Sequence, residues 1–543
     1  MKHRTGAFFT AVSLVATIAI AGCGNGAGEN AGPSGQPGGE ATSGSSSAGT
    51  KQGYSLPIVQ DGSVSLTFGG FDSWYPAASY TMNLPVWQEI EKKTGVKIDF
   101  QVVPADQYDA KMQTQIAAGS DLPDIMELTP TWTNAGVYRL AQQDVIRPLD
   151  DLIEQYAPDI KQFFEARPDI KKLLTAPDGK IYSIADLPLQ QVPSPFFIRQ
   201  DWLDKLGLSA PSTPDQWIEV LTAFKDKDPN NNGKQDEIPL VLRPGGYTYF
   251  GSAFGMQSPV QPFWADGSGK VEYQFLSPKF KELLAFTHDL YAKGLLDKEM
   301  NRDESNFNAL VSTNVVGASP TVLDYLLQQD SILKSAGVAD ANTVALKAPQ
   351  SASGQSGNYM MRSPLWSHYG IPTKSKYPEI AMKWINYAWI SEEGNLYKDY
   401  GVEGQSFTMG ADGPEYTDWV SNNPDKLDSM SALRSLGAAP SILVKDSLDV
   451  FKQKYAGTKV EQFMFLADDL LQPFPSPIPL EEESEVINQI MPDINTYVDE
   501  MIVKFIFGKE PIDNFDKFVQ KVESMGIDNV VQVVQAQYDR YSQ

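Results

Sequence analysis

The chain of 543 residues contains a single cysteine, Cys23, and this limits the ways in which the fold can be stabilised. One cysteine cannot form a disulfide within the chain or a cysteine-rich zinc site. The body must therefore be held together by buried apolar surface, and the chain is long enough for two or three sizeable cores. Hydrophobic residues make up 42% of the sequence and charged residues 21%, which is typical of a globular protein.

Cys23 directly follows a segment with the features of a secretory signal. Residues 1–4 are basic, residues 8–20 are apolar, and small residues precede the cysteine. The apolar stretch is too short to cross about 30 Å of hydrocarbon, which indicates a cleaved signal and not a membrane span. Small residues before a cysteine resemble the lipobox of bacterial lipoproteins, in which the thiol is acylated and the cysteine becomes the new N-terminus. We expect a signal peptide over residues 1–22 and lipidation of Cys23; the alternative is an ordinary secretory signal with an incidental cysteine.

The segment after the signal, residues 23–50, consists mainly of Gly, Ser, Ala, Pro, Asn, Glu and Thr. Such a composition cannot bury apolar surface, so we expect a flexible tether. The formal net charge of the chain is −24, which argues against nucleic acid as a partner and against electrostatic docking on anionic lipid. Signal, lipid and tether together predict a protein anchored at the extracellular face of a bacterial cell membrane.

The pattern of the body predicts an α/β fold. Residues 64–68 and 96–102 alternate between apolar and polar like strands, and residues 86–93 between them are typical of a helix. A second helix is predicted from apolar residues that recur every four positions; it ends at Gly119 and is followed by a short strand over residues 125–128. The order β-α-β-α-β indicates a largely parallel sheet.

A second body is expected after the proline-rich stretch 187–195. Residues 196–198 are typical of a strand and residues 201–206 of a short helix. Thr213 precedes a proline in the manner of an N-cap, which predicts a further helix. The C-terminal region shows helical stripes, with a last helix expected to run to Tyr541.

The most specific internal motif covers residues 228–237 and precedes a predicted strand over residues 238–242. Oxygen-bearing side chains recur at every second position, and Gly233 follows the third of them, where an EF-hand-type loop turns sharply. The glutamate that ends such a loop is replaced by Pro239, so Glu237 is expected to serve instead, and Lys234 offers its backbone carbonyl. The predicted ligands of a structural Ca²⁺ are Asp228, Asn230, Asn232, Lys234, Asp236 and Glu237. The alternative is a polar Asn/Gly turn without metal.

Aromatic residues make up 11% of the chain, and many lie in stretches that are expected to be loops. Sugar rings stack their C–H faces on aromatic rings, and their hydroxyls need charged or amide partners. One tryptophan alone is more often a core residue, so the prediction depends on the set. The tryptophans are predicted to stack, and the charged residues to contact hydroxyls or carboxylates. The predicted ligand-binding residues are Trp74, Glu127, Trp132, Trp264, Asp324, Arg362, Trp366 and Glu403.

These features together resemble family 1 extracellular solute-binding proteins of ABC importers, and most of all the large lipoprotein branch that includes alginate-oligosaccharide-binding proteins. The resemblance covers nearly all of the mature chain. In that branch the loop that is similar to residues 228–237 binds calcium. The matching stretches are residues 119–125, 176–182, 197–203, 227–239, 400–404 and 534–540.

The resemblance implies a type II periplasmic-binding-protein-like fold with two discontinuous α/β lobes. Residues 51–190 and roughly 312–375 are expected in lobe 1, and residues 191–311 and roughly 376–543 in lobe 2. It further implies a monomer that captures an oligosaccharide in the cleft, closes by a hinge motion and delivers the cargo to an ABC permease. It does not specify the sugar.

Other functions stay open at this point. With 68 acidic residues the chain always offers a carboxylate pair, so a secreted glycan-degrading enzyme is one alternative, although the sequence has no nucleophile motif or nucleotide-binding loop. A peptide-binding lipoprotein is another, because aromatic clefts also suit peptides. A surface lipoprotein without a small ligand is the third. We predict no catalytic residue.

Replacing Cys23 by serine removes the thiol that acylation requires and changes little else. We expect Cys23→Ser protein in the culture medium, whereas the unchanged chain stays with the membrane fraction. Immunoblots of the two fractions measure this distribution. Retention of the variant at the membrane contradicts the anchor.

Overall fold

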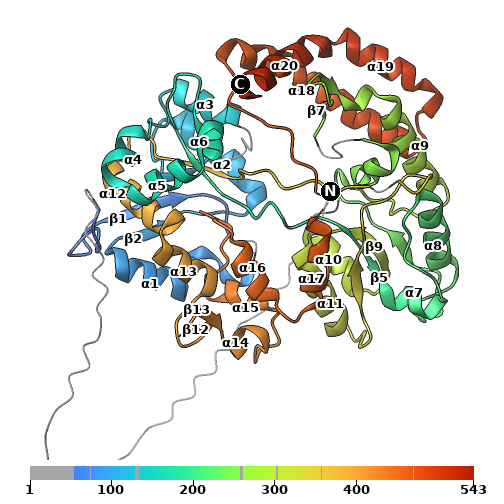
Figure 1. The fold of residues 1–543 in the computed structure, drawn as a ribbon, viewed down its shortest axis with the longest axis horizontal. Coiled ribbons are helices and arrows are strands. Elements are labelled where there is room, and N and C mark those ends of the chain that lie inside the picture. The colour runs from blue at the N-terminus through green and yellow to red at the C-terminus, as the bar shows by residue number, and fades with distance from the viewer. Residues whose placement is uncertain are drawn as a thin grey trace, which may run out of the picture. The chain divides into compact units, whose positions relative to one another are not determined.

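Two open β-sheets, each covered by helices, form the body of the chain (Figure 1). The computed structural model describes residues 54–73, 75–128, 134–256, 261–300, 302, 304–355, 357–468 and 470–542. These described residues belong to one compact unit. No helix among them is both long and apolar enough to span a bilayer. Signal peptide, tether and Cys23 lie outside the described residues.

The first sheet has the strand order β2-β1-β3-β11-β4. Strand β1 pairs in parallel with β2 and β3, and β11 runs antiparallel between β3 and β4. The expected β-α-β-α-β order is therefore confirmed. The strands are β1 Ser65–Gly69, β2 Lys97–Phe100, β3 Ile125–Glu127, β4 Ile184–Ala185 and β11 His368–Gly370.

Local signals explain the two helices between the first strands. Helix α1 (Pro85–Thr94) starts with proline, whose fixed φ suits a first helical turn, and ends at Gly95 with φ of 68°. Helix α2 (Ala105–Ala118) ends at Gly119 with φ of 62°. At both glycines the left-handed backbone would strain any residue with a Cβ atom.

The second sheet has the strand order β10-β5-β9-β6. Strand β5 runs antiparallel to both of its neighbours, and β6 pairs in parallel with β9. After β5, helix α7 (Gln200–Leu206) ends at Gly207, and helix α8 (Pro214–Asp226) is capped by Thr213 and Gln216 in a capping box. The strands are β5 Phe196–Arg199, β6 Ile238–Leu240, β9 Val316–Pro320 and β10 Thr343–Ala345.

Each sheet lies in its own hydrophobic core, and this divides the unit into two lobes. The first lobe comprises residues 54–188 and 364–446, and the second comprises residues 189–362 and 447–542. In Figure 1 the first lobe lies at the left and the second at the right. The chain crosses between the lobes three times, near residues 188, 363 and 446.

The observed lobes correct the expected boundaries. Residues 312–345 lie in the second lobe, not the first, because β9 and β10 both pair with β5. Residues 376–446 lie in the first lobe, not the second, because Trp384 and Trp389 pack in the core of the first sheet. Long-range strand pairing decides the first assignment, and packing in the hydrophobic core decides the second.

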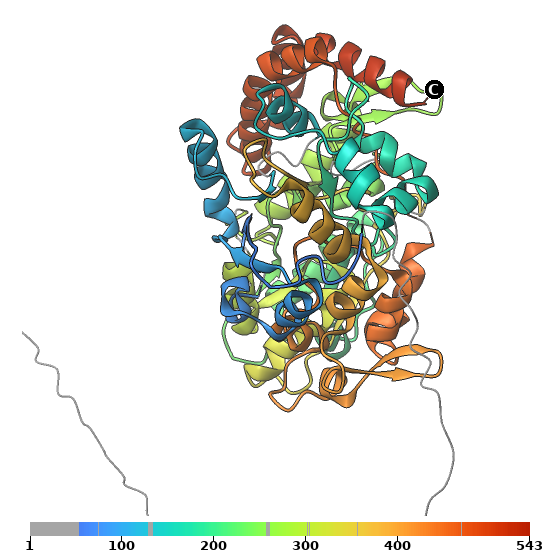
Figure 2. The ribbon, with the colours of Figure 1, turned by 90° about the vertical axis from the view of Figure 1, so that its left-hand side faces the viewer.

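The remaining helices cover the two sheets. Those of the first lobe are α3 Asn134–Gln142, α4 Asp150–Tyr156, α5 Pro158–Ala166, α6 Pro168–Leu174, α12 Pro378–Ile385, α13 Glu392–Tyr400, α14 Asp418–Ser421 and α15 Ser429–Ser435. Those of the second lobe are α9 Pro278–Ala292, α10 Glu304–Ser312, α11 Leu326–Ser335, α16 Leu448–Tyr455, α17 Lys459–Gln462, α18 Glu481–Ile506, α19 Phe515–Ser524 and α20 Ile527–Ser542. Helices α18 to α20 lie together at the top of both ribbon views (Figures 1 and 2). Two hairpins complete the fold, β7 Phe263–Ala265 with β8 Val271–Tyr273, and β12 Phe407–Gly410 with β13 Gly413–Tyr416.

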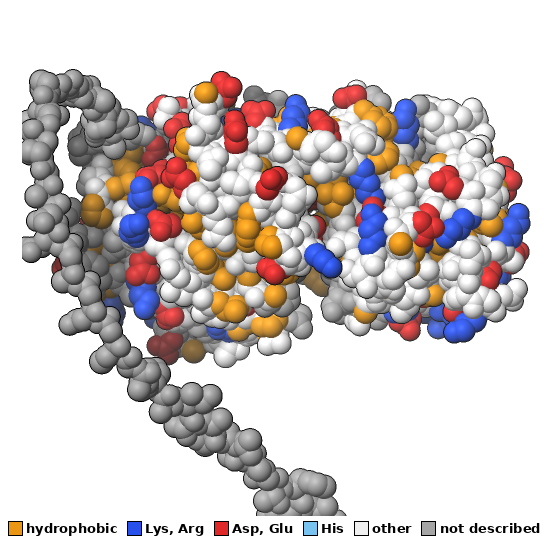
Figure 3. All heavy atoms as spheres, turned by 90° about the horizontal axis from the view of Figure 1, so that it is seen from below, with side chains coloured by type: hydrophobic (Ala, Val, Ile, Leu, Met, Phe, Trp, Pro, Cys, Tyr) orange, Lys and Arg blue, Asp and Glu red, His pale blue; other side chains and the backbone are white. Residues whose placement is uncertain are grey.

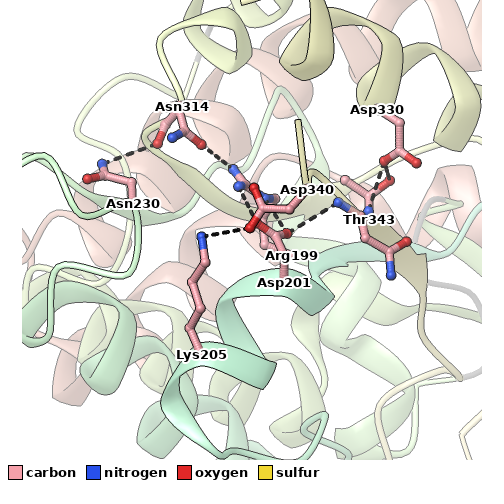
Figure 4. A network of polar contacts seen from close by, with 9 residues as sticks. Arg199, Asp201, Lys205, Asn230, Asn314, Asp330, Asp340 and Thr343 are labelled. Atoms are coloured by element: carbon pink, nitrogen blue, oxygen red, sulfur yellow. Dashed lines mark hydrogen bonds and ion pairs between the residues drawn. The ribbon is translucent and has the colours of Figure 1, made fainter. Parts of the chain in front are cut away.

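A buried ion pair sits at the end of β5. The guanidinium of Arg199, which is 0% exposed, donates two hydrogen bonds to Asp201 at 2.8 and 2.6 Å and a third to the Asn314 side chain at 2.7 Å (Figure 4). Asp201 also accepts from the backbone of Asn342 at 3.4 Å. The pair thereby joins β5, α7 and the segments before β9 and β10.

Removing one partner of this pair leaves the other charge buried. We expect Asp201→Ala to lower the free energy of unfolding by about 3–5 kcal/mol. Arg167 and Asp169 have the same spacing and the same two hydrogen bonds, at 2.9 and 2.6 Å, but they are exposed. Asp169→Ala should therefore cost less than about 1 kcal/mol. Urea denaturation of both variants measures the difference; equal costs would contradict a structural role for the buried pair.

Candidate ligand-binding cleft

A cavity of about 540 Å³, here named the interlobe cavity, lies between the two lobes. From the first lobe it is lined by Phe71, which follows β1, and by Asp186, which follows β4. From the second lobe it is lined by Arg243, which follows β6, and by Val322, which follows β9. The carboxyl ends of strands from both sheets therefore point at the same space, which is where open α/β sheets bind ligands. In Figure 3 the surface is hollowed between the two halves of the molecule.

The wall of the interlobe cavity combines aromatic rings with charges of both signs. Trp366 is 47% exposed, although five tryptophans of the described residues are buried in the cores: Trp87, Trp202, Trp217, Trp384 and Trp389. The backbone N–H of Trp366 donates to the carbonyl of Asp186 at 3.0 Å, which fixes the backbone of one crossing segment beside the end of β4. The aromatic lining residues are Phe71, Tyr325 and Trp366, and the charged ones are Asp186, Arg243, Asp324, Arg362, Arg434, Asp446 and Lys454.

Asp186 forms part of the cavity wall, but its carboxylate is directed into the protein. It accepts from the Val444 N–H at 2.7 Å and from the Tyr369 hydroxyl at 3.0 Å. Burial raises the pKa of Asp186 to about 8, although both hydrogen bonds oppose the rise. Nearby, burial lowers the pKa of Lys398 to about 8, and its ammonium donates to the carbonyl of Leu443.

In the loop over residues 228–237, side-chain oxygens accept hydrogen bonds from backbone N–H groups of the same loop. Asp228 accepts from the N–H groups of Asn232 at 3.1 Å and Gly233 at 2.9 Å, and Gly233 has a φ of 74°. The Asn232 side chain accepts from the N–H of Lys234 at 2.8 Å. The loop thus makes the sharp turn at its glycine that the sequence predicts.

The carboxylate of Glu237, unlike that of Asp228, makes no hydrogen bond in this loop. Both oxygens of its carboxylate are buried and make no hydrogen bond within the described residues, and burial raises its pKa. In the described part of the chain no group of three or more His, Cys, Asp and Glu side chains lies close enough to hold a metal ion. Carboxylates alone therefore do not form a ligand set in this loop, and asparagine and backbone oxygens would have to complete it.

The loop is connected to the buried ion pair of the second lobe. The side chain of Asn230 donates to the carbonyl of Asn314 at 3.2 Å, and the Asn314 side chain accepts from Arg199 (Figure 4). Residue 238, directly after the loop, begins β6. The loop therefore holds the starting ends of β6 and β9, whose other ends carry residues of the interlobe cavity.

Residues 73–389, more than half of the chain, match the family described as bacterial extracellular solute-binding protein. The chain belongs to this family. The resemblance seen in the sequence is thereby confirmed. In this solute-binding protein the cavity between the lobes is the natural candidate for the solute site.

Two relatives are similar over most of the chain. The fructooligosaccharide ABC transporter substrate-binding protein FusA of Streptococcus pneumoniae is 27% identical over 501 residues, which is 84% of this chain and 87% of the relative. The polygalacturonan/rhamnogalacturonan-binding protein YtcQ of Bacillus subtilis is 25% identical over 461 residues, 82% of this chain and 86% of the relative. Lipoprotein LipO of Bacillus subtilis is 29% identical over 225 residues, 40% of this chain and 42% of the relative.

Solved structures confirm the expected two-lobed α/β fold. The alginate-binding protein AlgQ2, solved without calcium ion, has a TM-score of 0.76 at 24% identity, with coverage of 89% of this chain and 99% of that chain. FusA of Streptococcus pneumoniae in complex with kestose has a TM-score of 0.74 at 24% identity, with coverage of 88% and 99%. An EF-hand mutant of FusA is equally similar, with a TM-score of 0.74.

The structure brings three of the predicted ligand residues together. Asp324, Arg362 and Trp366 all line the interlobe cavity. The Arg362 guanidinium and the Asp324 carboxylate are 3.9 Å apart, which is too far for a hydrogen bond. Asp324 and Arg362 also line a smaller adjoining cavity of about 90 Å³.

Glu127 lies behind the cavity wall and does not line it. Its carboxylate is 0% exposed and accepts from the Phe71 N–H at 3.1 Å. Burial raises its pKa well above the usual range. A Cβ atom at Gly70 would come within 2.7 Å of this carboxylate, so glycine is required there. Glu127 therefore positions Phe71, a lining residue.

The other predicted residues lie elsewhere or outside the described structure. Trp264 is half-buried in the β7–β8 hairpin, and Glu403 is exposed in the turn before β12; neither lines the interlobe cavity. Trp74 and Trp132 lie outside the described residues. Contact of these four side chains with a ligand stays a prediction.

Several cavity residues escape sequence reasoning. Arg434 lies on α15 and Lys454 on α16, and each by itself looks like an ordinary surface charge on a helix. Asp186 could have been predicted as a cavity residue, because it directly follows a short buried strand. An acidic residue at the carboxyl end of a strand marks the edge where ligands bind.

Proposed function

We propose that this solute-binding protein is the extracellular subunit of an ABC importer and that it captures an oligosaccharide in the interlobe cavity. The observation that carries the proposal is the half-exposed indole of Trp366 among charged side chains at the meeting point of the two sheets. Relatives named for binding fructooligosaccharide and polygalacturonan support it.

The residues of the cavity suit a sugar. The ring of Trp366 offers an apolar face on which the C–H face of a pyranose or furanose stacks. Asp324 accepts hydrogen bonds from hydroxyls, and Arg362 donates them. Three crossing segments join the lobes, so a hinge motion closes the two walls over the cargo.

The proposal assigns binding and delivery, not chemistry. The relatives over most of the chain are named as binding proteins, which supports a non-enzymatic role. The cargo passes to a membrane permease. Lipidation of Cys23, with residues 24–50 as a tether, would keep a monomeric body at the extracellular face of the membrane, and similarity to a lipoprotein supports this placement.

We also propose a structural Ca²⁺ in the loop over residues 228–237. The buried, unpaired carboxylate of Glu237 fits a cation, because an unpartnered buried carboxylate is costly. The ligand set would be the oxygens of Asp228, Asn230, Asn232, Lys234, Asp236 and Glu237, with the backbone carbonyl in the case of Lys234. Calcium would offset two of the three negative charges of the acidic side chains in this loop and hold the start of β6.

A thermal-shift screen of plant and bacterial glycans beside peptides tests the proposed cargo. We expect glycans to raise the melting temperature, and Trp366→Ala to weaken glycan affinity by about 2 kcal/mol, or thirtyfold, because an apolar face is lost. Phe465→Ala is the matched control, since Phe465 is also 47% exposed but lies outside the interlobe cavity. Product analysis accompanies the screen. Turnover of a glycan would indicate an enzyme, and a response to peptides alone would indicate a peptide-binding protein.

Calcium titration of the chelator-treated protein tests the metal site. Saturating Ca²⁺ at about a hundred times its Kd should stabilise the fold by about 2.7 kcal/mol and raise the melting temperature. Asp228→Ala and Glu237→Gln should abolish this response. Asp266 accepts from the N–H groups of Ser268 and Lys270 in a similar turn, so Asp266→Ala is the control that keeps it. An unchanged melting temperature with calcium and with chelator refutes the site.

A further inference from the structure

The interlobe cavity is positively charged, although the chain as a whole is strongly acidic. Three carboxylates line it, those of Asp186, Asp324 and Asp446. Four cations against three carboxylates leave a formal excess of one positive charge, whereas the chain carries −24. The cations are Arg243, Arg362, Arg434 and Lys454.

One of the three carboxylates contributes little negative charge. Asp186 accepts from Val444 and Tyr369 within the protein, and burial raises its pKa to about 8, so it is largely protonated at pH 7. Without the charge of Asp186, two carboxylates stand against four cations, which is a formal excess of two positive charges.

The two remaining carboxylates leave Arg362 without a close ion pair. Asp446 accepts from the N–H of Leu189 at 2.9 Å. Asp324 approaches Arg362 only to 3.9 Å, and the Nη2 atom of Arg362 is buried without a hydrogen bond among the described residues. The partner of this nitrogen in the long ion pair, Oδ1 of Asp324, is also buried without a hydrogen bond, so the pair leaves the Arg362 nitrogen able to donate to a closer acceptor.

Lys454 and Arg434 are also open to a further acceptor. The Lys454 ammonium is half-buried and lies 4.9 Å from the centre of the Tyr455 ring, and it forms no ion pair within 4.0 Å among the described residues. Arg434 makes a long contact of 3.5 Å to the carbonyl of Ala439. Arg362 and Lys454 both line the interlobe cavity and its smaller neighbour, so both side chains face the same space.

We infer that the cargo is an acidic oligosaccharide, and that a uronate carboxylate of one sugar unit binds between Arg362 and Lys454 while Trp366 stacks on a ring. The inference rests on the proposed function and specifies the class of sugar. A carboxylate fits the fork of a guanidinium and compensates the excess charge, whereas a neutral glycan offers only hydroxyl dipoles. Such hydroxyls leave the excess positive charge of the cavity uncompensated.

Calorimetric titration of the mature protein with paired ligands tests the inference. The acidic probes are trimers of galacturonate, mannuronate and guluronate, and each is compared with the same trimer after reduction of its carboxyl groups to alcohols. Kestose is an unrelated neutral probe. We expect at least one acidic trimer to bind about tenfold or more tightly than its reduced form, because hydrogen bonds to charged groups contribute more than those to neutral ones.

Two variants connect the preference to the cavity. Arg362→Gln keeps a hydrogen-bond donor but removes the charge, so it should weaken binding of the acidic trimer about tenfold or more and change binding of the reduced trimer little. Arg167→Gln removes an exposed, paired arginine outside the interlobe cavity and should change neither. Melting temperatures of both variants show whether they are folded.

The outcomes separate this inference from the proposed function. If a reduced trimer or kestose binds as tightly as every acidic trimer, the acidic cargo is wrong while oligosaccharide binding stands. If Arg362→Gln weakens both forms equally, the carboxylate does not bind at Arg362 and the inference falls. If no probe binds and the wider glycan screen is also empty, the proposed function fails, and the inference fails with it.

Discussion

The buried guanidinium of Arg199 holds the second lobe in register. It ends β5, pairs with Asp201 on α7 and reaches Asn314 ahead of β9. Through Asn314 it is connected to Asn230 of the 228–237 loop, which leads into β6. A charge in a core is favourable only when every donor has a partner, so these segments have one arrangement that satisfies it. The order of β5, β9 and β6 depends on that arrangement.

This register matters because β6 and β9 run in parallel from the network to the interlobe cavity. At one end they begin beside Asn314 and residue 237, and at the other they deliver Arg243 and Asp324. In the first lobe, Phe71 likewise follows the end of a strand, and its backbone N–H donates a hydrogen bond to the Glu127 carboxylate behind the cavity wall. The cavity is therefore assembled from strand ends that rigid sheets position, and not from loops alone.

Local features of the fold were predictable, since they depend on residues close in sequence. Thr213 with the following proline marks the start of α8, and Gly95 and Gly119 mark helix ends. The lobe boundaries were not predictable from such signals, because β9 belongs to the second sheet through pairing with strands about 80 to 120 residues away in the sequence. The residues of the site also divide into those that the sequence predicts and those that only the folded structure brings together. Trp366 was recognisable as an aromatic residue in a loop, whereas Lys454 became a cavity residue only through the packing of α16 across the lobes.

The crossing segments near residues 188, 363 and 446 are bonded to one another. Leu187 forms backbone hydrogen bonds with Val444 and Asp446, and the Gln190 side chain donates to the carbonyl of Arg362. Residues close to a rotation axis move least when two bodies turn about it. Arg362 and Asp446 lie at these bonded segments, so the proposed hinge motion would displace them less than the outlying walls. Under that motion, the cargo would meet this part of the site in nearly the same form before and after closure.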